Sequence, residues 1–283
     1  MEQNDFLTRV EQNKNRMSSG QHLICDYILT NYDKAAFMTA SKLAQKVGVS
    51  ESTVVRFAES LGYEGYPKLK KALQEMIRNK LTSLQRIELM GDLDPSQVLN
   101  TVIKSDLTNL KTTLNEIDND EFCKIIDLLF NARTVYILGL RSSAPLAQFL
   151  GYYLDFVLSN VKVVTSGVGD IFEQMLHINE NDVLFAISFP RYSARTIDGL
   201  AFAKKRNART IAFTDSLISP LAAEADHCLL ARSDMASFVD SLVAPFSVVN
   251  ALIVATSLRK KESVSAKFEE MEATWDEFGI YLG

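Results

Sequence analysis

The stretch from Thr39 to Gly62, TASKLAQKVGVSESTVVRFAESLG, decides the fold of the first part of this chain. Three small or apolar residues share the inner face of a predicted helix: Leu43, Ala44 and Val47. Gly48 can adopt the left-handed conformation that ends a helix, because it has no Cβ, and Val49 then anchors the turn. Ser50 is a favoured N-cap for the helix that follows. The pattern predicts a helix-turn-helix.

The second helix of this motif has one apolar and one polar face. Its apolar residues recur at helical spacing: Val54, Phe57, Ala58 and Leu61. The second helix of such a motif lies in the major groove of DNA, where its first residues contact the bases. We therefore expect DNA contacts from Ser50, Glu51, Ser52, Thr53 and Arg56. Three lysines that follow Pro67 on a further predicted helix suit backbone phosphates: Lys68, Lys70 and Lys71.

The charge of the chain is divided unevenly. Residues 1–80 carry 12 basic and 9 acidic residues, a net charge of +3, whereas the remainder carries 18 and 26, a net charge of −8. A predicted helix over Gln21–Asn31 supplies four residues to a small three-helix core: Leu23, Ile24, Tyr27 and Ile28. A plain two-helix packing unit would explain the motif alone, but a basic balance beside it favours nucleic-acid binding.

After residue 134 the pattern changes from helices to short apolar runs separated by helical stretches. The runs are TVYILGL from Thr134, VKVVTSG from Val161, DVLFAISF from Asp182, RTIAFTD from Arg209 and HCLLA from His227. Continuous apolar runs of this length are typical of strands buried on both faces. We expect an N-terminal all-α helix-turn-helix domain joined to a C-terminal α/β domain with a five-stranded, parallel, doubly wound sheet.

The expected domain boundaries are 1–80 for the helix-turn-helix, 81–117 for a helical linker and 118–283 for the α/β domain. Apolar residues recur at helical spacing in the linker: Val98, Val102, Leu107, Leu110 and Leu114. Two further helices are predicted over Ala236–Lys260 and Ser263–Tyr281. The region Phe238–Thr256 of the first is apolar on most sides, and both it and the linker helix suit either core packing or a dimer interface.

Two loops of the α/β domain combine a basic residue with hydroxyl groups at a helix start. If the strand order is 2-1-3-4-5, both loops meet where the order reverses, which is where such sheets bind ligands. The residues expected to bind an anionic effector are Gly139, Arg141, Ser142, Ser143, Ser188, Arg191, Tyr192 and Ser193. Thr214-Asp215-Ser216 follows the next strand. The alternative is that the serines only cap helices and the arginines are solvated.

The run SKLAQKVGVSESTVVRFAESLGYEGYPKLKKAL closely resembles the DNA-binding domain of the RpiR family of bacterial regulators. The resemblance continues into the second half, where that family carries a sugar isomerase (SIS) domain, and it implies a phosphosugar effector. In the binding loops the family's Gly-x-Gly-x-Ser becomes Gly139–Ser143, and its Ser-x-Ser-Gly-x-Thr becomes Ser188–Ser193. Arginines replace both close-approach glycines, so a carboxylate metabolite is the alternative effector.

Two competing function classes remain at this level. An isomerase of the same fold would need a positioned base, and Glu173 with His177, four residues apart, or His227 are the candidates. Each is explained equally well as a helix pair or by packing, so we expect a regulator with no catalytic residues. A protein-binding module with a vestigial pocket would bind DNA with an affinity indifferent to every metabolite.

The expected partners are double-stranded DNA with a near-palindromic site and an anionic small molecule, with the chain acting as a homodimer or homotetramer. The three cysteines, Cys25, Cys123 and Cys228, form no CxxC pair, so we expect no disulfide framework and no metal site. The motifs indicate no cofactor. The polar N-terminus and interrupted apolar runs predict no membrane segment, consistent with a cytoplasmic protein.

Overall fold

In the computed structural model of the chain, the predicted helix-turn-helix is formed by α4 (Ala40–Val47) and α5 (Glu51–Ser60). The structure describes residues 6–77, 86, 94–158, 160–167, 169–235 and 239–281. Its internal contacts divide the chain into two units, Met1–Asp92 and Leu93–Gly283.

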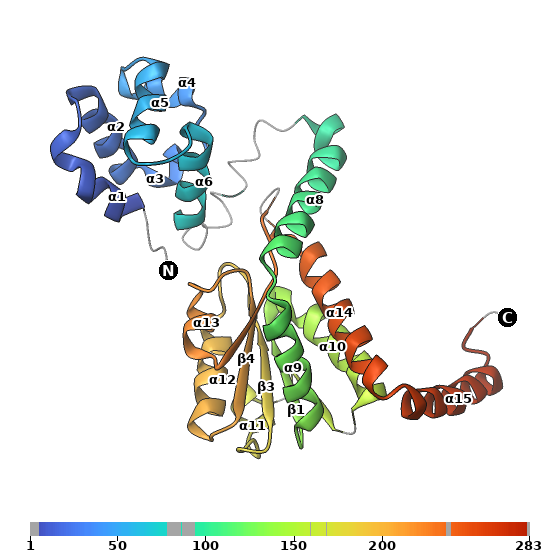
Figure 1. The fold of residues 1–283 in the computed structure, drawn as a ribbon. Helices are drawn as coiled ribbons and strands as arrows, with labels where there is room; N and C mark the ends of the chain where they lie inside the picture. The colour runs from blue at the N-terminus through green and yellow to red at the C-terminus, as the bar shows by residue number, and fades with distance from the viewer. Residues whose placement is uncertain are drawn as a thin grey trace. The chain divides into compact units, whose positions relative to one another are not determined.

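The first unit is entirely helical in the part that the structure describes. Around the central pair lie α1 (Phe6–Asn13), η1 (Lys14–Arg16), α2 (Ser19–Thr30), α3 (Tyr32–Ala35) and α6 (Tyr66–Ile77) (Figure 1). Its core contains apolar side chains from several of these helices, including Phe6, Ile24, Ile28, Leu43, Val54, Phe57, Leu69 and Leu73. The Tyr66 hydroxyl donates to the Met38 carbonyl (3.0 Å), which ties α6 to the segment before α4. Burial raises the pKa of Tyr66 to about 12.

The turn between α4 and α5 has the geometry that its residues predict. Gly48 adopts φ +81°, and the Ser50 side chain accepts from the Thr53 backbone N–H. Val54, Phe57, Ala58 and Leu61 are buried, as their spacing predicts. One expectation for this core was wrong: Leu23 is 53% exposed, and the neighbouring Cys25 is buried instead. The helix α2 turns Cys25 inward because Ile24 and Ile28 set the orientation of its buried face.

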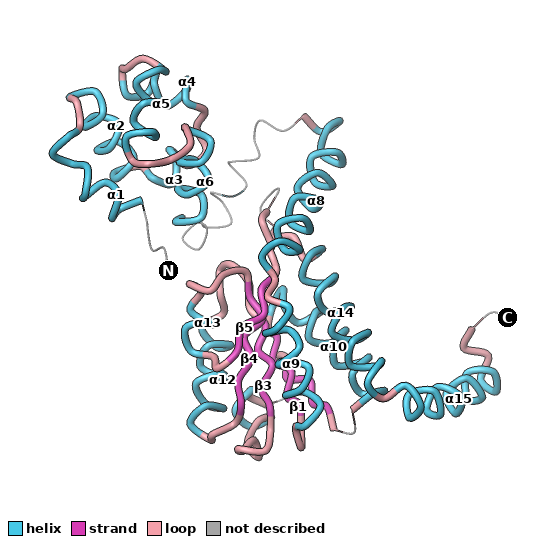
Figure 2. Tube along the Cα trace, in the orientation of Figure 1, coloured by secondary structure: helices cyan, strands magenta, loops and turns pink. Residues whose placement is uncertain are grey.

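The second unit contains a five-stranded parallel sheet in the order β2-β1-β3-β4-β5 (Figure 2). The strands are β1 (Val135–Gly139), β2 (Val161–Val164), β3 (Val183–Ile187), β4 (Arg209–Thr214) and β5 (His227–Leu230). This is the predicted doubly wound topology. β1 and β3 are buried throughout and β4 in all but its first residue, but β2 and β5 are partly exposed, contrary to the expectation of five buried strands. Each outer strand has only one neighbour, so less of it is covered.

Helices cover both faces of the sheet. One face carries α9 (Asn119–Asn131), α10 (Ala144–Val157) and α14 (Val243–Arg259); the other carries α11 (Ile171–Gln174), α12 (Ala194–Lys205) and α13 (Pro220–Glu224). Alternate residues of each central strand face opposite layers, since the side-chain period of a strand is two. Ile137 therefore packs in the layer of α10, and Leu138 in the layer of α12.

The helix α8 (Val98–Glu116) belongs to this second unit and packs against α14. Its buried residues are polar: Asn109 exchanges two hydrogen bonds with the Asp234 backbone, and the Thr113 hydroxyl accepts from the Arg232 N–H (2.8 Å). Most of its apolar residues are exposed instead, among them Leu99 (71%) and Leu114 (75%), whereas Leu110 is half-buried. We expected 81–117 to be a linker distinct from both domains, whereas the described part from Asp94 to Ile117 lies within the second unit.

The last two helices are α14 and α15 (Lys261–Phe278). The predicted start of the first helix, from Ala236 to Phe238, lies outside the described residues. The exposed residues of α14 recur at helical spacing along one face: Val243, Ser247, Asn250, Val254 and Leu258. Core packing therefore accounts for only part of this apolar helix.

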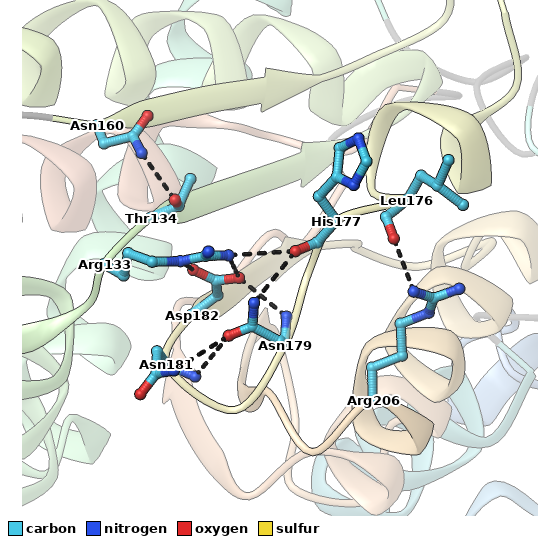
Figure 3. Close-up of polar contacts among 9 residues, drawn as sticks. All are labelled: Arg133, Thr134, Asn160, Leu176, His177, Asn179, Asn181, Asp182 and Arg206. Carbon is cyan, nitrogen blue, oxygen red and sulfur yellow. Dashed lines mark hydrogen bonds and ion pairs between the residues drawn. The ribbon is translucent and has the colours of Figure 1, made fainter.

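A polar cluster ties together the chain segments at the amino ends of β1 and β3 (Figure 3). The Asp182 side chain is fully buried and accepts two hydrogen bonds from Arg133, at 2.9 and 2.6 Å. It also accepts from the Asn179 N–H (2.9 Å). Burial alone would raise the pKa of Asp182, but hydrogen bonds from Arg133 and Asn179 outweigh it and hold that pKa below its ordinary value.

Replacing Asp182 with asparagine should destabilise the second unit by on the order of 2 kcal/mol, since a buried, charge-assisted pair is lost. The folded pKa lies below the ordinary value of 3.8, so the stabilisation is present above pH 3.8 and is lost as the pH falls through the folded pKa. Urea unfolding of the wild type and of Asp182→Asn should therefore show a difference in the free energy of unfolding that becomes smaller below pH 3.8. Asp198→Asn, at an exposed position of α12, is the control and should change little. An equal gap at all pH values would contradict this role.

Candidate DNA-binding and effector sites

The first turns of α5 present a hydrogen-bonded cluster of hydroxyls and one guanidinium. The Ser50 hydroxyl shares hydrogen bonds with Ser52 (2.8 Å) and Thr53 (2.7 Å). Arg56 donates through Nε to the Ser52 carbonyl and through Nη2 to its hydroxyl, both at 3.3 Å. Glu51, Ser52 and Arg56 are exposed. Four predicted DNA-contacting residues therefore form one connected group, in which Ser50 also caps the helix.

The three predicted phosphate-contacting lysines lie together on α6. Lys68 and Lys71 are exposed, Lys70 is half-buried, and Lys68 lies 3.9 Å from Glu64, which is also exposed. An exposed pair of this kind contributes little energy, so the Lys68 ammonium remains available to another anion.

The start of α2 packs beside α5 through two contacts that helical periodicity does not reveal. A Cβ on Gly20 would lie 3.3 Å from the Thr53 side chain and 3.6 Å from Val49. The Gln21 side chain donates to the Ser60 hydroxyl (3.2 Å). Helix α2 therefore supports both ends of α5. No pattern in the sequence signals this contact, because it depends on how the helices cross.

In the second unit, the two predicted effector loops leave the sheet side by side. Gly139 pairs with Ile187 in the register of β1 and β3, so Leu140 and Ser188 begin neighbouring loops at the carboxyl edge. The first loop forms η3 (Arg141–Ser143) and leads into α10; the second leads into α12. This is the point where the strand order reverses, and the amino ends of α10 and α12 lie at the same edge.

Both loop arginines have backbone conformations that are rare for residues with a side chain. Arg141 has φ +55° and Arg191 has φ +63°. Among the described non-glycine residues, only Asn207 shares this property, and asparagine tolerates it better. The loops therefore keep a backbone shape that suits glycine while carrying guanidinium groups, at a cost of about 1 kcal/mol or more for each residue.

The loop serines are placed differently from simple helix caps. Ser143 and Ser193 occupy the N-cap positions of α10 and α12, but neither side chain makes a capping hydrogen bond. Ser188 is 3% exposed, and its hydroxyl accepts from the Ser193 N–H (3.1 Å), which closes the second loop. Ser142 is exposed. The alternative in which Ser143 and Ser193 serve as side-chain caps is therefore wrong in this structure.

Gly139 has a packing role that the sequence did not indicate. A Cβ at this position would lie 2.7 Å from both the Ala147 side chain and the Ser143 carbonyl. Glycine is required here so that the first turn of α10 can approach the end of β1. The residue therefore shapes the first loop from within.

Two further residues complete this edge of the sheet. The Tyr192 hydroxyl donates to the Asp215 carboxylate (2.8 Å), which is 5% exposed and also accepts from Thr214 (3.3 Å). Thr196, in the first turn of α12, is fully buried, and its hydroxyl has no hydrogen-bond partner among the described residues. The position of Asp215 after β4 was a usable signal, whereas nothing in the sequence distinguished Thr196.

The residues considered for proton transfer do not form a catalytic pair. Contrary to our expectation, Glu173 and His177 do not share a helical face, because helix α11 ends at Gln174. The Glu173 carboxylate accepts from the Asp170 N–H (2.9 Å) in a capping box. His227 lies 2.8 Å from the Glu121 carboxylate, between β5 and α9.

The described residues contain no group of three His, Cys, Asp or Glu side chains placed to hold a metal ion. Within the same part of the chain, no helix is both long and apolar enough to cross a membrane.

Comparison with known proteins gives two domain matches. Residues 4–80 match the helix-turn-helix domain of the rpiR family, and residues 128–255 match the SIS domain. An uncharacterised helix-turn-helix transcriptional regulator of Clostridium perfringens is 28% identical over 224 residues, covering 78% of this chain and 80% of its own length.

Two solved structures are also similar. The sugar isomerase domain of an RpiR transcription factor from Sphaerobacter thermophilus is 30% identical with a TM-score of 0.60, covering 62% of this chain and 99% of that one. The Vibrio vulnificus NanR protein, solved in complex with ManNAc-6P, is 22% identical with a TM-score of 0.58, covering 96% and 98%.

Replacing Arg141 with glycine should raise the free energy of unfolding of the second unit by about 1 kcal/mol, because glycine adopts a positive φ without a Cβ clash. The matched control is Arg141→Ala, which removes the guanidinium but keeps the strained backbone and should bring no gain. Urea denaturation of the three proteins gives the comparison. A destabilised Arg141→Gly protein would show that the conformation is not strained.

Proposed function

Because the chain belongs to the RpiR family of helix-turn-helix transcriptional regulators, we propose that its SIS domain binds an anionic metabolite and thereby changes DNA binding. The observation that carries this proposal is the pair of arginines, Arg141 and Arg191, held in left-handed conformations on adjacent loops. Strain of this kind persists where the surrounding structure maintains it, and it concentrates at binding sites.

Three features of the loops favour an anion. Guanidinium groups form forked hydrogen bonds with carboxylate and phosphate oxygens. The first turns of α10 and α12 add backbone N–H groups and the positive ends of two helix dipoles. Ser142 is exposed beside Arg141 and can donate to the same ligand.

A sugar phosphate or amino-sugar phosphate is the first choice of effector, and a carboxylate metabolite is the second. The SIS domain favours the sugar phosphate. The arginines at both glycine positions are equally suited to bind a carboxylate, because guanidinium groups form forked hydrogen bonds with carboxylates as well as phosphates. The NanR complex supports only the fold at 22% identity, so the class of ligand rests on the loops of this chain and on the class of domain.

We assign no reaction to the chain. Relatives over most of its length are named as transcriptional regulators. Glu173 is engaged in capping α11. His227 pairs with Glu121 at the amino end of β5, whereas the two loops leave the carboxyl edge of the sheet. An aldose–ketose isomerase needs a base next to the substrate carbon, which these positions do not supply.

We also propose that the chain acts as a two-fold dimer through α14. The exposed stripe of Val243, Val254 and Leu258 gives an apolar face that a second copy can cover symmetrically. The exposed residues Leu99, Ile103, Leu107 and Leu114 form a second such face on α8. A dimer presents two recognition helices to the two halves of a near-palindromic site.

If the effector binds only one of two dimer arrangements, its binding shifts the population toward that arrangement and thereby changes how much DNA is bound. A hundredfold difference in affinity between two arrangements corresponds to about 2.7 kcal/mol. Helix α8 belongs to the unit that carries the effector loops and directly follows the segment leading from the helix-turn-helix. It is therefore the element through which we expect a change to be transmitted.

The effector proposal is tested by calorimetry and thermal shift against phosphosugars, organic acids and neutral sugars. An anionic effector at one hundred times its dissociation constant should stabilise the second unit by about 2.7 kcal/mol. Arg141→Gly and Arg191→Gly should weaken binding at least tenfold, whereas Arg141→Lys should retain part of it. Binding of neutral compounds alone would overturn the proposal.

Arg56→Ala should reduce affinity for a duplex selected by the wild-type protein from a random pool by at least tenfold, because base or phosphate contacts of the guanidinium are lost. Lys205→Ala, an exposed position of the second unit, is the matched control for loss of one positive charge. Fluorescence anisotropy at fixed salt gives the affinities, and calorimetry should show unchanged effector binding. If Arg56→Ala bound DNA with normal affinity, the surface that contacts DNA would have to lie elsewhere than at the start of α5.

A further inference from the structure

Helix α15 carries an aromatic ridge that its own subunit covers only at the start. Figure 1 shows the helix running away from the sheet beyond the end of α14. Phe268, Met271, Trp275 and Phe278 recur every three or four residues and so share one face. The first of these packs on Phe156 of α10, with ring centroids 5.4 Å apart.

The far end of α15 is left exposed. Trp275 stacks edge-on against Tyr281 (5.1 Å), and three neighbouring side chains are largely in solvent: Phe278 (69%), Ile280 (59%) and Tyr281 (66%). We call Trp275, Phe278, Ile280 and Tyr281 the arm tip. Several large apolar side chains exposed together are typical of an interaction surface.

An apolar groove lies at the opposite end of α14, between that helix, α8 and α9. It has a volume of about 430 Å³, and its lining includes Leu110, Leu114, Ile117, Phe122 and Val248. This volume is within the range of cavities that hold a compact organic group. The residues that α14 contributes, from Ala244 to Ala251, belong to its first half, whereas α15 begins after its last residue.

The charges of the two surfaces are complementary. The described acidic residues of α15 are Glu269, Glu270, Glu272, Asp276 and Glu277, and none is paired with another described residue. On α8, Asp106 accepts from Ser241 (2.5 Å) and Glu116 pairs with Arg232 (2.5 Å). Lys104 and Lys111 of the same helix have no acidic partner among the described residues, and Lys111 lines the groove.

We propose that the arm tip of one copy docks in the groove between α8 and α14 of a second copy. This inference rests on the proposed α14 dimer. Across a two-fold axis, antiparallel α14 helices place the end of one beside the start of the other, and α15 therefore leads toward the partner's groove. Two arms and two grooves then close the assembly symmetrically.

Trp275 is the only tryptophan of the chain and therefore reports on the arm tip directly. When the concentration of the wild-type protein is raised from below to above its dimer dissociation constant, the tryptophan emission should shift to shorter wavelength, because water is excluded from the indole. Phe278→Glu and Leu114→Glu should raise the dissociation constant at least tenfold. Leu176→Glu, an exposed leucine outside both surfaces, should leave it unchanged. An emission maximum that does not change on dimer formation would overturn the proposal.

Disulfide trapping between two chains distinguishes docking in a partner from docking within one chain. Phe278→Cys and Leu114→Cys are made separately in a Cys123→Ser background, since Cys123 is an exposed native thiol. After the two variants are mixed and mildly oxidised, a covalent dimer of one chain of each should form in high yield. This yield should exceed that of the covalent homodimer formed when either variant is oxidised by itself. No cross-link in the mixture, or an intrachain cross-link in the double variant, would refute docking in trans.

Sedimentation equilibrium separates this inference from the proposal on which it rests. Val254→Glu, in the α14 stripe, should dissociate the dimer. A dimeric wild-type protein that loses its dimer with Val254→Glu but shows no Phe278–Leu114 cross-link would retain the proposed function and refute the arm docking. A monomeric wild-type protein that binds effector and DNA would refute both the dimer and the arm.

Discussion

The parallel pairing of β1 with β3 organises the whole of the second unit. Gly139 lies opposite Ile187, so the chain leaves both strands at the same edge and begins two loops side by side. Because β1 is buried on both faces, its register cannot shift without moving Ile137 and Leu138 into the wrong layers. The same pairing that packs the core therefore fixes the distance between the loops that carry the arginines.

The two ends of this sheet have different roles. At the amino edge, the fully buried carboxylate of Asp182 accepts hydrogen bonds from Arg133 and from the Asn179 N–H, which is typical of a structural ion pair. At the carboxyl edge, Arg141 and Arg191 adopt strained backbone conformations. Satisfied polar groups at one edge stabilise the scaffold, and the strained loops at the other edge lie where a ligand can approach the helix ends.

Helix α8 has an unusual distribution of polar and apolar side chains. Its buried face is polar because Asn109 and Thr113 satisfy backbone groups of residues 232–234, for which an apolar side chain would leave no partner. Most of its apolar residues consequently face outward. The exposed faces of α8, α14 and α15 all belong to the second unit, which makes this unit the natural place for association between subunits.

Local signals in the sequence are sufficient to predict the helix-turn-helix and the strands. The left-handed Gly48, the cap at Ser50 and the spacing from Val54 to Leu61 define the helix-turn-helix, and the five apolar runs define the strands, because turns, caps and periodicity act over a few residues. The residues that end each strand could likewise be located, and with them the two loops proposed to bind an effector.

The tertiary structure settles which faces of these elements are covered. It buried Cys25 rather than Leu23, ended α11 before His177, exposed the apolar side of α8 and brought Gly20 against Thr53. It also assigned Gly139 to helix packing and placed both loop arginines at positive φ. These outcomes depend on contacts between segments far apart in the chain, which periodicity does not encode. A strained backbone, moreover, is maintained by its surroundings and not by its own residue type.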